Sequence, residues 1–221
     1  LQYELSYTNI LNILDLGNIE ILAKDRKLDD PFVMVGGPCA YNSEPLADFV
    51  DIVILGEGEE VNLEVLNEYK EWKKNKTTRE DFLMRISKIE GVYIPSFYDV
   101  TYNEDKTVKE TVPNREGVPA HPRKRIIKNM DEVPYPEALI VPYIETVHER
   151  VVLELFRGCT RGCRFCQAGM IYRPIREKSI ETLKASLDKL IKSTGYDEIS
   201  LSSLSTSDYS KLSELTDVLI E

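Results

Sequence analysis

The 221-residue sequence has few histidines and no long hydrophobic run. Only two histidines are present, and no stretch approaches the roughly eighteen uninterrupted apolar residues that a membrane-spanning helix needs. The segment from Leu1 to Leu16 is apolar but lacks the basic start and the small-residue cleavage site of a signal peptide. The sequence therefore predicts a globular protein that is neither exported nor placed in a membrane.

Positive charge is also scarce. The chain has 38 acidic and 28 basic residues, which gives a formal net charge of −10 at pH 7. Because binding to phosphate backbones needs positive surface, a general nucleic-acid-binding role is not indicated. The run Arg123-Lys124-Arg125 is interpreted as part of a solvated connector.

Cysteines number four, and they are not dispersed as in a secreted disulfide protein. Three of them lie close together in the stretch LELFRGCTRGCRFCQAG, as Cys159, Cys163 and Cys166. This distribution predicts a reducing, cytoplasmic setting and suggests that the three thiols share a ligand.

The first region is predicted to be α/β. Two short apolar runs, 32–35 and 51–55, each end in a glycine-rich loop, which is typical of buried parallel strands. With the helices around them, they predict a doubly wound, flavodoxin-like parallel sheet. The predicted helices are 8–16, with Thr8 as a possible N-cap and Gly17 as its end, and 60–74.

The middle region changes character. Thr78 to Asp81 resembles a capping box that starts a charged helix, and 97–112 alternates as a β-hairpin that turns at Asn103 to Lys106. Frequent prolines after the hairpin exclude a long regular element, so this region is predicted to be a connector.

The third region reads as strand, loop, helix, strand, loop and helix. A strand at 151–156 leads into the cysteine loop, Ser179 caps a helix that ends at Gly195, and EISLSSL begins a second strand. This order predicts the first two βα units of a parallel barrel, with its functional loops at the C-terminal ends of the strands. The predicted apolar face of the helix consists of Ile180, Leu183, Leu187, Leu190 and Ile191.

Three regions are therefore predicted: 1–75, 76–142 and 143–221. The sequence opens without methionine and stops inside an apolar-periodic run, so we expect it to be an interior piece of a longer chain. Barrel strands after the second, and the active-site residues they carry, are expected to lie beyond it.

The three clustered cysteines admit more than one metal. Zinc favours four cysteine or histidine ligands, and the fourth is hard to find, since His148 precedes the strand and Cys39 lies in the first region. An iron–sulfur electron carrier also needs a fourth cysteine. A 4Fe-4S cluster held by three cysteines leaves one iron open to a substrate or cofactor and matches the count.

The cysteine stretch resembles the radical S-adenosylmethionine (SAM) family. The family signature is cysteine, three residues, cysteine, any residue, an aromatic residue and cysteine, which Cys159, Cys163, Phe165 and Cys166 match. The resemblance implies a 4Fe-4S cluster on these cysteines, reductive cleavage of SAM to a 5′-deoxyadenosyl radical, and a low-potential electron donor such as flavodoxin or ferredoxin. The electron-carrier and zinc-stabilised binding-module alternatives remain open.

The same resemblance implies roles outside the cysteines. Phe165 would lie near the adenine of SAM. The loop after the second strand would bind the methionine amine, although it reads Ser-Leu-Ser-Thr where the family has Gly-Gly-Glu. The residues assigned to that role are Ser203, Ser205 and Thr206.

Several arginines surround the cysteines. Together they favour an anionic ligand, whereas each one alone could simply lie on a solvated face and pair with Glu154 or Glu177. These residues are Arg157, Arg161, Arg164, Arg173 and Arg176.

The first region resembles part of a cobalamin-binding signature. Ser6, Thr8 and the pair Gly36-Gly37 have the spacing of its serine and glycine elements, with Thr8 in place of leucine. The resemblance implies that these four residues contact cobalamin, while the alternative is an ordinary strand-to-helix glycine turn. The whole chain thus resembles radical SAM proteins with an N-terminal cobalamin-binding domain, whose substrate stays unknown.

Overall fold

The computed structural model describes residues 1–75, 77–144 and 146–220 and divides into two compact units, Leu1–Ile126 and Ile127–Glu221. Positions 76, 145 and 221, which fall in the second and third predicted regions, lie outside the described residues. The predicted connector contains a helix and a hairpin that both belong to the first unit.

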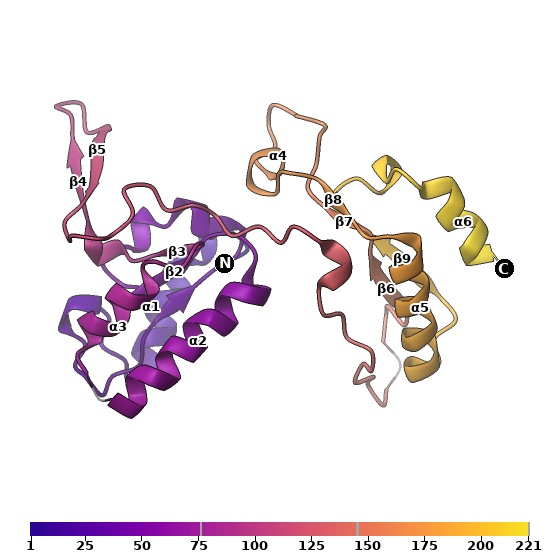
Figure 1. Cartoon of the computed structure of the whole chain (residues 1–221), viewed down its shortest axis with the longest axis horizontal. Helices are drawn as coiled ribbons and strands as arrows, with labels where there is room; N and C mark the ends of the chain where they lie inside the picture. The colour runs from indigo at the N-terminus through magenta and orange to yellow at the C-terminus, as the bar shows by residue number, and fades with distance from the viewer. Residues whose placement is uncertain (76, 145, 221) are drawn as a thin grey trace. The chain divides into compact units, whose positions relative to one another are not determined.

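The first unit contains a three-stranded sheet in the order β1-β2-β3 (Figure 1). β1 (Met34–Val35) pairs in parallel with β2 (Ile52–Ile54), which confirms the predicted parallel pair. β3 (Val92–Tyr93) runs antiparallel to β2, and the sequence had placed no strand there. The observed sheet is thus small and mixed.

β1 is shorter than the predicted strand over 32–35. The Val33 N–H donates to Asp51 Oδ2 at 2.7 Å instead of entering the strand ladder. The Phe32 ring lies with its centroid 5.3 Å from that of Trp72 and 4.7 Å from that of Phe82. The Val33 carbonyl still accepts from the Asp51 and Ile52 N–H groups, at 2.9 and 3.2 Å, so Val33 lies at the point where the pairing with β2 begins.

Helices surround this sheet. α1 (Tyr7–Leu16) ends at Gly17, as predicted. The predicted N-cap at Thr8 is wrong, because the helix begins at Tyr7 and Ser6 occupies the N-cap position, without a side-chain capping hydrogen bond. α3 (Arg79–Ile86) begins with the predicted capping box: the Asp81 N–H donates to Thr78 Oγ1 at 3.1 Å, and the Thr78 N–H donates to Asp81 Oδ2 at 3.0 Å. α2 spans Gly58–Asn75, and the short 3-10 helices of this unit are Glu4–Ser6, Ala23–Asp25, Pro38–Asn42, Glu44–Leu46 and Pro95–Phe97.

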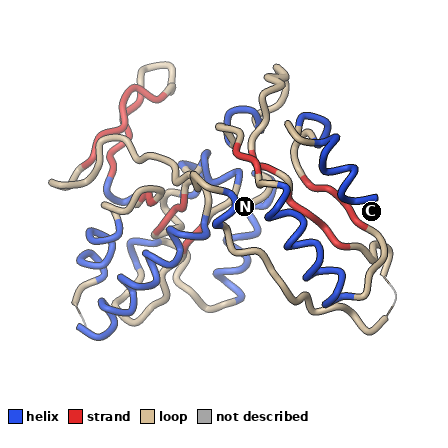
Figure 2. Tube along the Cα trace, turned by 45° about the vertical axis from the view of Figure 1, so that its right-hand side comes forward, coloured by secondary structure: helices blue, strands red, loops and turns tan. Residues whose placement is uncertain are grey.

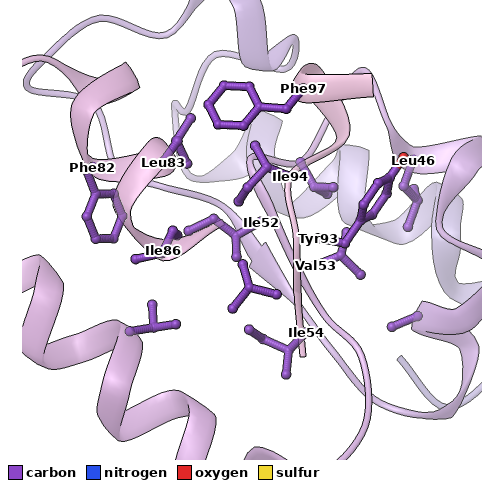
Figure 3. Close-up of a cluster of buried hydrophobic side chains, with 14 of the residues drawn as sticks. Leu46, Ile52, Val53, Ile54, Phe82, Leu83, Ile86, Tyr93, Ile94 and Phe97 are labelled. Carbon is purple, nitrogen blue, oxygen red and sulfur yellow. The ribbon is translucent and has the colours of Figure 1, made fainter. Parts of the chain in front are cut away.

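Apolar side chains of the sheet and of α1, α2 and α3 form the core of the first unit, part of which is shown in Figure 3. All three residues of β2 are buried, which explains why its sequence is apolar without alternation. The labelled core residues in Figure 3 are Leu46, Ile52, Val53, Ile54, Phe82, Leu83, Ile86, Tyr93, Ile94 and Phe97.

The predicted hairpin is confirmed. β4 (Tyr98–Tyr102) pairs antiparallel with β5 (Val108–Pro113), and the turn between them includes Lys106 at φ 67°. Its tip extends away from the sheet of the first unit in both views (Figures 1 and 2).

The second unit contains the predicted strand, helix, strand and helix in that order along the chain (Figure 1). β6 (Val151–Glu154) pairs in parallel with β9 (Ile199–Ser202), and α5 (Ile180–Thr194) connects them and packs against β6. Ser179 Oγ accepts from the Thr182 N–H at 3.2 Å, and Gly195 ends the helix at φ 73°, as predicted. α6 spans Leu212–Ile220 and the 3-10 helices are Met130–Glu132 and Thr206–Asp208 (η7).

Two predictions for this unit need correction. The single strand over 151–156 is wrong, because after Leu155 the chain leaves β6 and forms β7 (Phe156–Arg157), which pairs antiparallel with β8 (Arg176–Glu177). Ile191 lies at the edge of the apolar face of α5 and is 37% exposed, whereas the other four predicted positions are buried.

Candidate functional site

The cysteine loop spans 158–175 and is closed at its base. β7 enters it and β8 leaves it, with Phe156 opposite Glu177 and Arg157 opposite Arg176. Gly158 has φ 103°, and a Cβ there would lie 2.7 Å from the carbonyl oxygen of Pro174. Only glycine fits this close approach, so the residue before Cys159 holds the two ends of the loop together.

The three cysteines occupy the exposed part of this loop. Cys159 is half-buried, and Cys163 and Cys166 are exposed. The Cys166 N–H donates to the Cys163 carbonyl at 3.0 Å, so these two residues are the first and fourth of a turn. Among the described residues, no group of three or more His, Cys, Asp or Glu side chains is arranged to hold a metal ion.

The chemistry of this donor set fits an iron–sulfur cluster. Each cysteine of such a cluster binds a different iron, and thiolates are its usual protein ligands. All three thiols are free and come from one loop. The described histidine of the second unit, His148, instead lies 3.4 Å from Arg150 Nη2 through its Nδ1 atom.

Arg161, between the first two cysteines, joins the cysteine loop to the loop after β9. Its Nε donates to Asp208 Oδ2 at 2.6 Å, and a second contact joins Nη2 to Oδ1. The ion pair with Asp208 raises the pKa of Arg161, and Cys159 and Cys163 add to this shift, so both thiols lie within electrostatic reach of the guanidinium. The same ion pair lowers the pKa of Asp208.

Asp208 was not among the predicted site residues. Its partner Arg161 had been assigned only to a group of arginines around the cysteines. The two residues are 47 positions apart, and no local pattern in the sequence signals their contact.

The three residues predicted to bind the methionine amine of SAM lie in the loop that follows β9. Ser203 Oγ and Thr206 Oγ1 are 3.0 Å apart, and the Asp208 N–H donates to the Ser205 carbonyl at 2.8 Å. Because β6 and β9 are parallel, this loop and the cysteine loop leave the same edge of the strand pair. Phe165, predicted to lie near the adenine, is 93% exposed.

A cluster of charges lies at the base of the cysteine loop. Glu154, at the end of β6, accepts from Arg157 Nε at 2.7 Å and from Lys178 Nζ at 3.3 Å. Burial alone would raise the pKa of Glu154, but the two cations outweigh it and lower the pKa. The pairing of Arg157 with Glu154 was one of the open alternatives for the arginines, and Lys178 was missed.

Two other residues near the loop have partners within the second unit. Arg176 donates to the carbonyl oxygens of Pro174 at 3.1 Å and Ile127 at 2.9 Å. Glu177 accepts from the Ser210 N–H at 3.0 Å and also from the Ser210 hydroxyl. Arg176 thus binds two backbone carbonyl groups in addition to carrying a positive charge.

The residues predicted to bind cobalamin have contacts within the first unit. Ser6 Oγ donates to the Tyr3 carbonyl at 2.6 Å, and Thr8 is exposed on α1. Gly37 has φ 99°, and a Cβ there would lie 2.8 Å from the backbone of Leu1. The close approach of the Leu1 backbone therefore accounts for a glycine at position 37.

Tyr7 joins the two halves of this predicted signature. Its hydroxyl lies 2.6 Å from the Cys39 carbonyl and 2.8 Å from the Asn42 carbonyl. The serine–threonine segment and the loop after Gly36-Gly37 are therefore neighbours, through a residue that the prediction did not use.

Comparison with known proteins finds two domains in the chain. Residues 1–95 match the model of radical SAM proteins, N-terminal, and residues 153–221 match the model of the radical SAM superfamily. The chain thus carries a radical SAM N-terminal domain and a radical SAM superfamily domain. The superfamily domain implies a 4Fe-4S cluster and SAM.

The chain is also similar to an uncharacterized protein of Methanocaldococcus jannaschii. The two are 29% identical over 224 residues, which cover 99% of this chain and 40% of that protein. The chain therefore spans about two fifths of the length of this relative. In the described part of the chain, no helix combines the length and the apolar character that crossing a membrane requires.

Proposed function

We propose that the chain is part of a radical SAM enzyme in which Cys159, Cys163 and Cys166 hold a 4Fe-4S cluster. The observation that carries this proposal is the parallel pairing of β6 and β9, which directs the cysteine loop and the Ser203 to Thr206 loop to one edge, where Arg161 and Asp208 join them. When bound, the cluster supplies the electron that cleaves SAM to methionine and a 5′-deoxyadenosyl radical.

The residues of the chain have separate tasks in this proposal. The thiols bind iron. The close approach of Gly158 to Pro174 holds the two ends of the cysteine loop together and so limits the positions that the three thiols can take. The hydroxyl groups of Ser203 and Thr206 are suited to accept hydrogen bonds from an ammonium group. The exposed ring of Phe165 is available to stack on a base.

The proposal includes an electron donor and a compartment. Reduction of the cluster needs a low-potential donor such as flavodoxin or ferredoxin. Exposed thiols at Cys163 and Cys166 are best preserved in the reducing cytoplasm, where we place the protein. The substrate of the radical is not assigned.

Cysteine substitutions in the full-length protein test this function. Anaerobically reconstituted protein is expected to hold about four irons and four sulfides per chain and to convert SAM to 5′-deoxyadenosine in the presence of dithionite. Cys163→Ala should abolish both, because it removes one thiolate of the cluster. Iron and sulfide analysis with chromatography of the nucleoside measures them.

Cys39→Ala is the matched control. Cys39 is buried in the first unit, where its Sγ lies 3.1 Å from the Gln2 carbonyl, so the variant should keep cluster and cleavage. An electron carrier would hold iron without cleaving SAM, and a zinc module would hold zinc without visible absorption. Either result would contradict the proposal.

Cobalamin binding by Ser6, Thr8, Gly36 and Gly37 stays a prediction. The residues present do not form an evident site, because Ser6 has a local partner and Gly37 lies against Leu1. No step of the proposed function uses cobalamin. A spectroscopic titration of the full-length protein with cobalamin decides it, and no spectral change would exclude binding.

A further inference from the structure

A small cavity of the first unit lies at the carboxyl ends of its two parallel strands. The segment that contains Tyr41 and Glu44 follows β1, Leu55 follows β2, and these residues line the cavity. Its volume is about 340 Å³, which suits a small ligand. Open α/β sheets bind ligands at this edge of their strands. The four residues predicted to bind cobalamin are not part of its lining.

Two buried tyrosines line this cavity. Tyr93 and Tyr98 are each 8% exposed, and their ring centroids are 4.9 Å apart. The Tyr93 hydroxyl donates to Glu44 Oε1. Burial raises the pKa of Tyr93, and Glu44 raises it further, so the phenol keeps its proton and remains the donor in this bond. The carboxylate of Glu44 is therefore held next to an aromatic ring.

Glu44 carries a negative charge that no cation of the cavity balances. Among the described residues its carboxylate forms no ion pair, and its Oε2 atom accepts no hydrogen bond. The described residues that line the cavity include neither lysine nor arginine. His121 is part of the lining and forms no ion pair with Glu44. One carboxylate oxygen is thus available to a ligand.

Glu44 also borders the larger cavity of this unit, of about 860 Å³, where the charges bind one another. The arginines of that cavity pair with its carboxylates, for example Arg115 with Glu80. Lys24 borders the larger cavity too, and within the described part of the chain it forms no ion pair with Glu44. The smaller cavity differs because its carboxylate has no cationic partner.

Hydrogen bonds of the first unit hold the walls of the smaller cavity. The Tyr7 hydroxyl binds the segment after β1 through the carbonyl oxygens of Cys39 and Asn42, at 2.6 and 2.8 Å. The Tyr98 hydroxyl donates to the Pro119 carbonyl at 2.7 Å, directly before the lining residues 120–122. Because these contacts already order the walls, little ordering is needed when a ligand binds.

We propose that this cavity binds an organic ammonium group, carried by a small molecule or by a lysine side chain, through Glu44 and the tyrosine rings. A carboxylate oxygen without a partner accepts a strong hydrogen bond from an ammonium N–H. Aromatic rings attract cations through the negative charge of their faces. A divalent metal ion fits less well, because it takes about six oxygen ligands and Glu44 is the one carboxylate among the described lining residues.

A titration of the full-length protein with butylammonium, followed by saturation-transfer NMR at about pH 8, where free histidine is uncharged, tests the proposal. The comparison is with n-butanol, which has the same carbon chain but no charge. Butylammonium is expected to bind at least about tenfold more tightly. Equal affinities, or no binding of butylammonium at tens of millimolar, would overturn the proposal. The test does not depend on the cluster, because the cavity lies in the first unit.

Two variants separate the charge of Glu44 from its bond to Tyr93. Glu44→Gln removes the charge at nearly constant size and should lower the affinity for butylammonium about tenfold, with no change for n-butanol. Tyr93→Phe removes the hydroxyl but keeps the ring and the carboxylate, so the preference for butylammonium should remain. If Glu44 only holds Tyr93 in place, Glu44→Gln will not change that preference, and the proposal fails.

Glu80→Gln is the matched control. It is the same substitution at a carboxylate that borders the larger cavity and pairs with Arg115. It should leave the affinity for butylammonium unchanged, and a loss equal to that of Glu44→Gln would show a general charge effect instead of a site. Circular dichroism and the fluorescence of the buried Trp72 confirm that each variant is folded.

Lysine blocked as its acetyl and methylamide derivative distinguishes the two sources of the ammonium group. Binding at least as tight as that of butylammonium, and lost in Glu44→Gln, identifies a lysine side chain as a ligand that the cavity accepts. Binding of butylammonium alone identifies a free small amine, since the cavity then excludes the peptide groups. Binding of either probe that is insensitive to Glu44→Gln would overturn the assignment of this cavity.

Discussion

Each unit of the chain buries one carboxylate with two cations, but the two clusters are built differently. In the first unit Asp51, just before β2, accepts from Arg26 Nη1 at 2.7 Å, from Arg79 Nη2 at 3.0 Å and from the Val33 N–H at 2.7 Å. Arg26 also donates to the carbonyl oxygens of three residues. These are Glu20, Ile21 and Phe49.

The cluster of the second unit is less complete. Glu154 lies at the end of β6, and its Lys178 partner has one acceptor among the described residues. A buried charge whose hydrogen bonds are all made is a structural element, because moving it would break many contacts at once. Lys178 makes one side-chain hydrogen bond, so fewer contacts hold its charge in place than hold Arg26.

The largest effect is expected in the first unit. Asp51→Asn leaves Arg26 and Arg79 buried without their carboxylate and should lower the free energy of unfolding of this unit by about 3–5 kcal/mol. Urea unfolding followed by fluorescence measures it, since the single tryptophan, Trp72, is buried in the first unit.

An exposed ion pair of the same unit provides the control for Asp51. Arg115→Gln removes the pair with Glu80, in which both side chains are well exposed, and should cost less than about 1 kcal/mol. If the two variants lowered the free energy of unfolding equally, the buried ion pairs of Asp51 would contribute no more to stability than an exposed ion pair.

A smaller, pH-dependent effect is expected at Glu154. Glu154→Gln should lower the stability of the second unit by about 1–3 kcal/mol near neutral pH, because it removes charge-assisted hydrogen bonds. The folded-state pKa of Glu154 is lowered, so the unfolded state binds more protons as acid is added. The stabilisation is therefore present above the unfolded pKa of about 4.3 and is lost as pH falls through the lowered folded pKa.

Thermal unfolding of wild type and Glu154→Gln, followed by far-ultraviolet circular dichroism at a series of pH values, measures this dependence. The difference between the two proteins should be constant above about pH 5 and shrink below about pH 4. A difference that grew on acidification would show that the carboxylate is not stabilised by its two cations.

The smallest effect on stability is expected for Arg161→Gln. The Arg161 side chain is 58% exposed, so its ion pair with Asp208 is screened by solvent and should contribute little to the free energy of unfolding. Hydrogen exchange in the 159–166 segment should nevertheless become several-fold faster, because the loop loses its connection to η7.

Arg85→Gln is the matched control for this loop effect, since Arg85 pairs with Glu68 between two exposed side chains of the first unit. It should leave exchange in the 159–166 segment unchanged. Equal exchange in the Arg161 variant and in wild type would mean that the ion pair does not restrain the cysteine loop.

Local signals predicted much of the fold. The capping box at Thr78, the hairpin turn before Thr107, and α5 between Ser179 and Gly195 were confirmed, because caps and turns depend on residues only a few positions apart. The parallel pairs of β1 with β2 and of β6 with β9 were also confirmed, since buried apolar runs separated by helices have few other arrangements.

The residues at which β6 ends and β1 begins could not be predicted, because they depend on contacts between residues far apart in the sequence. The sequence showed one apolar run over 151–156, yet the chain changes partner at Leu155 because β7 can pair with β8 only when the cysteine loop closes. Likewise, β1 starts at Met34 because the N–H of Val33 finds the carboxylate of Asp51, 18 positions away.

The sequence by itself determined the positions of the three cysteines, because their spacing within eight residues is local and carries a recognisable chemistry. The tertiary structure decided which charges surround them. Asp208 reaches Arg161 across 47 positions, and Lys178 reaches Glu154 across 24. Ion pairs over such separations depend on where parallel strands and their loops end in space, and spacing along a chain contains no information about that.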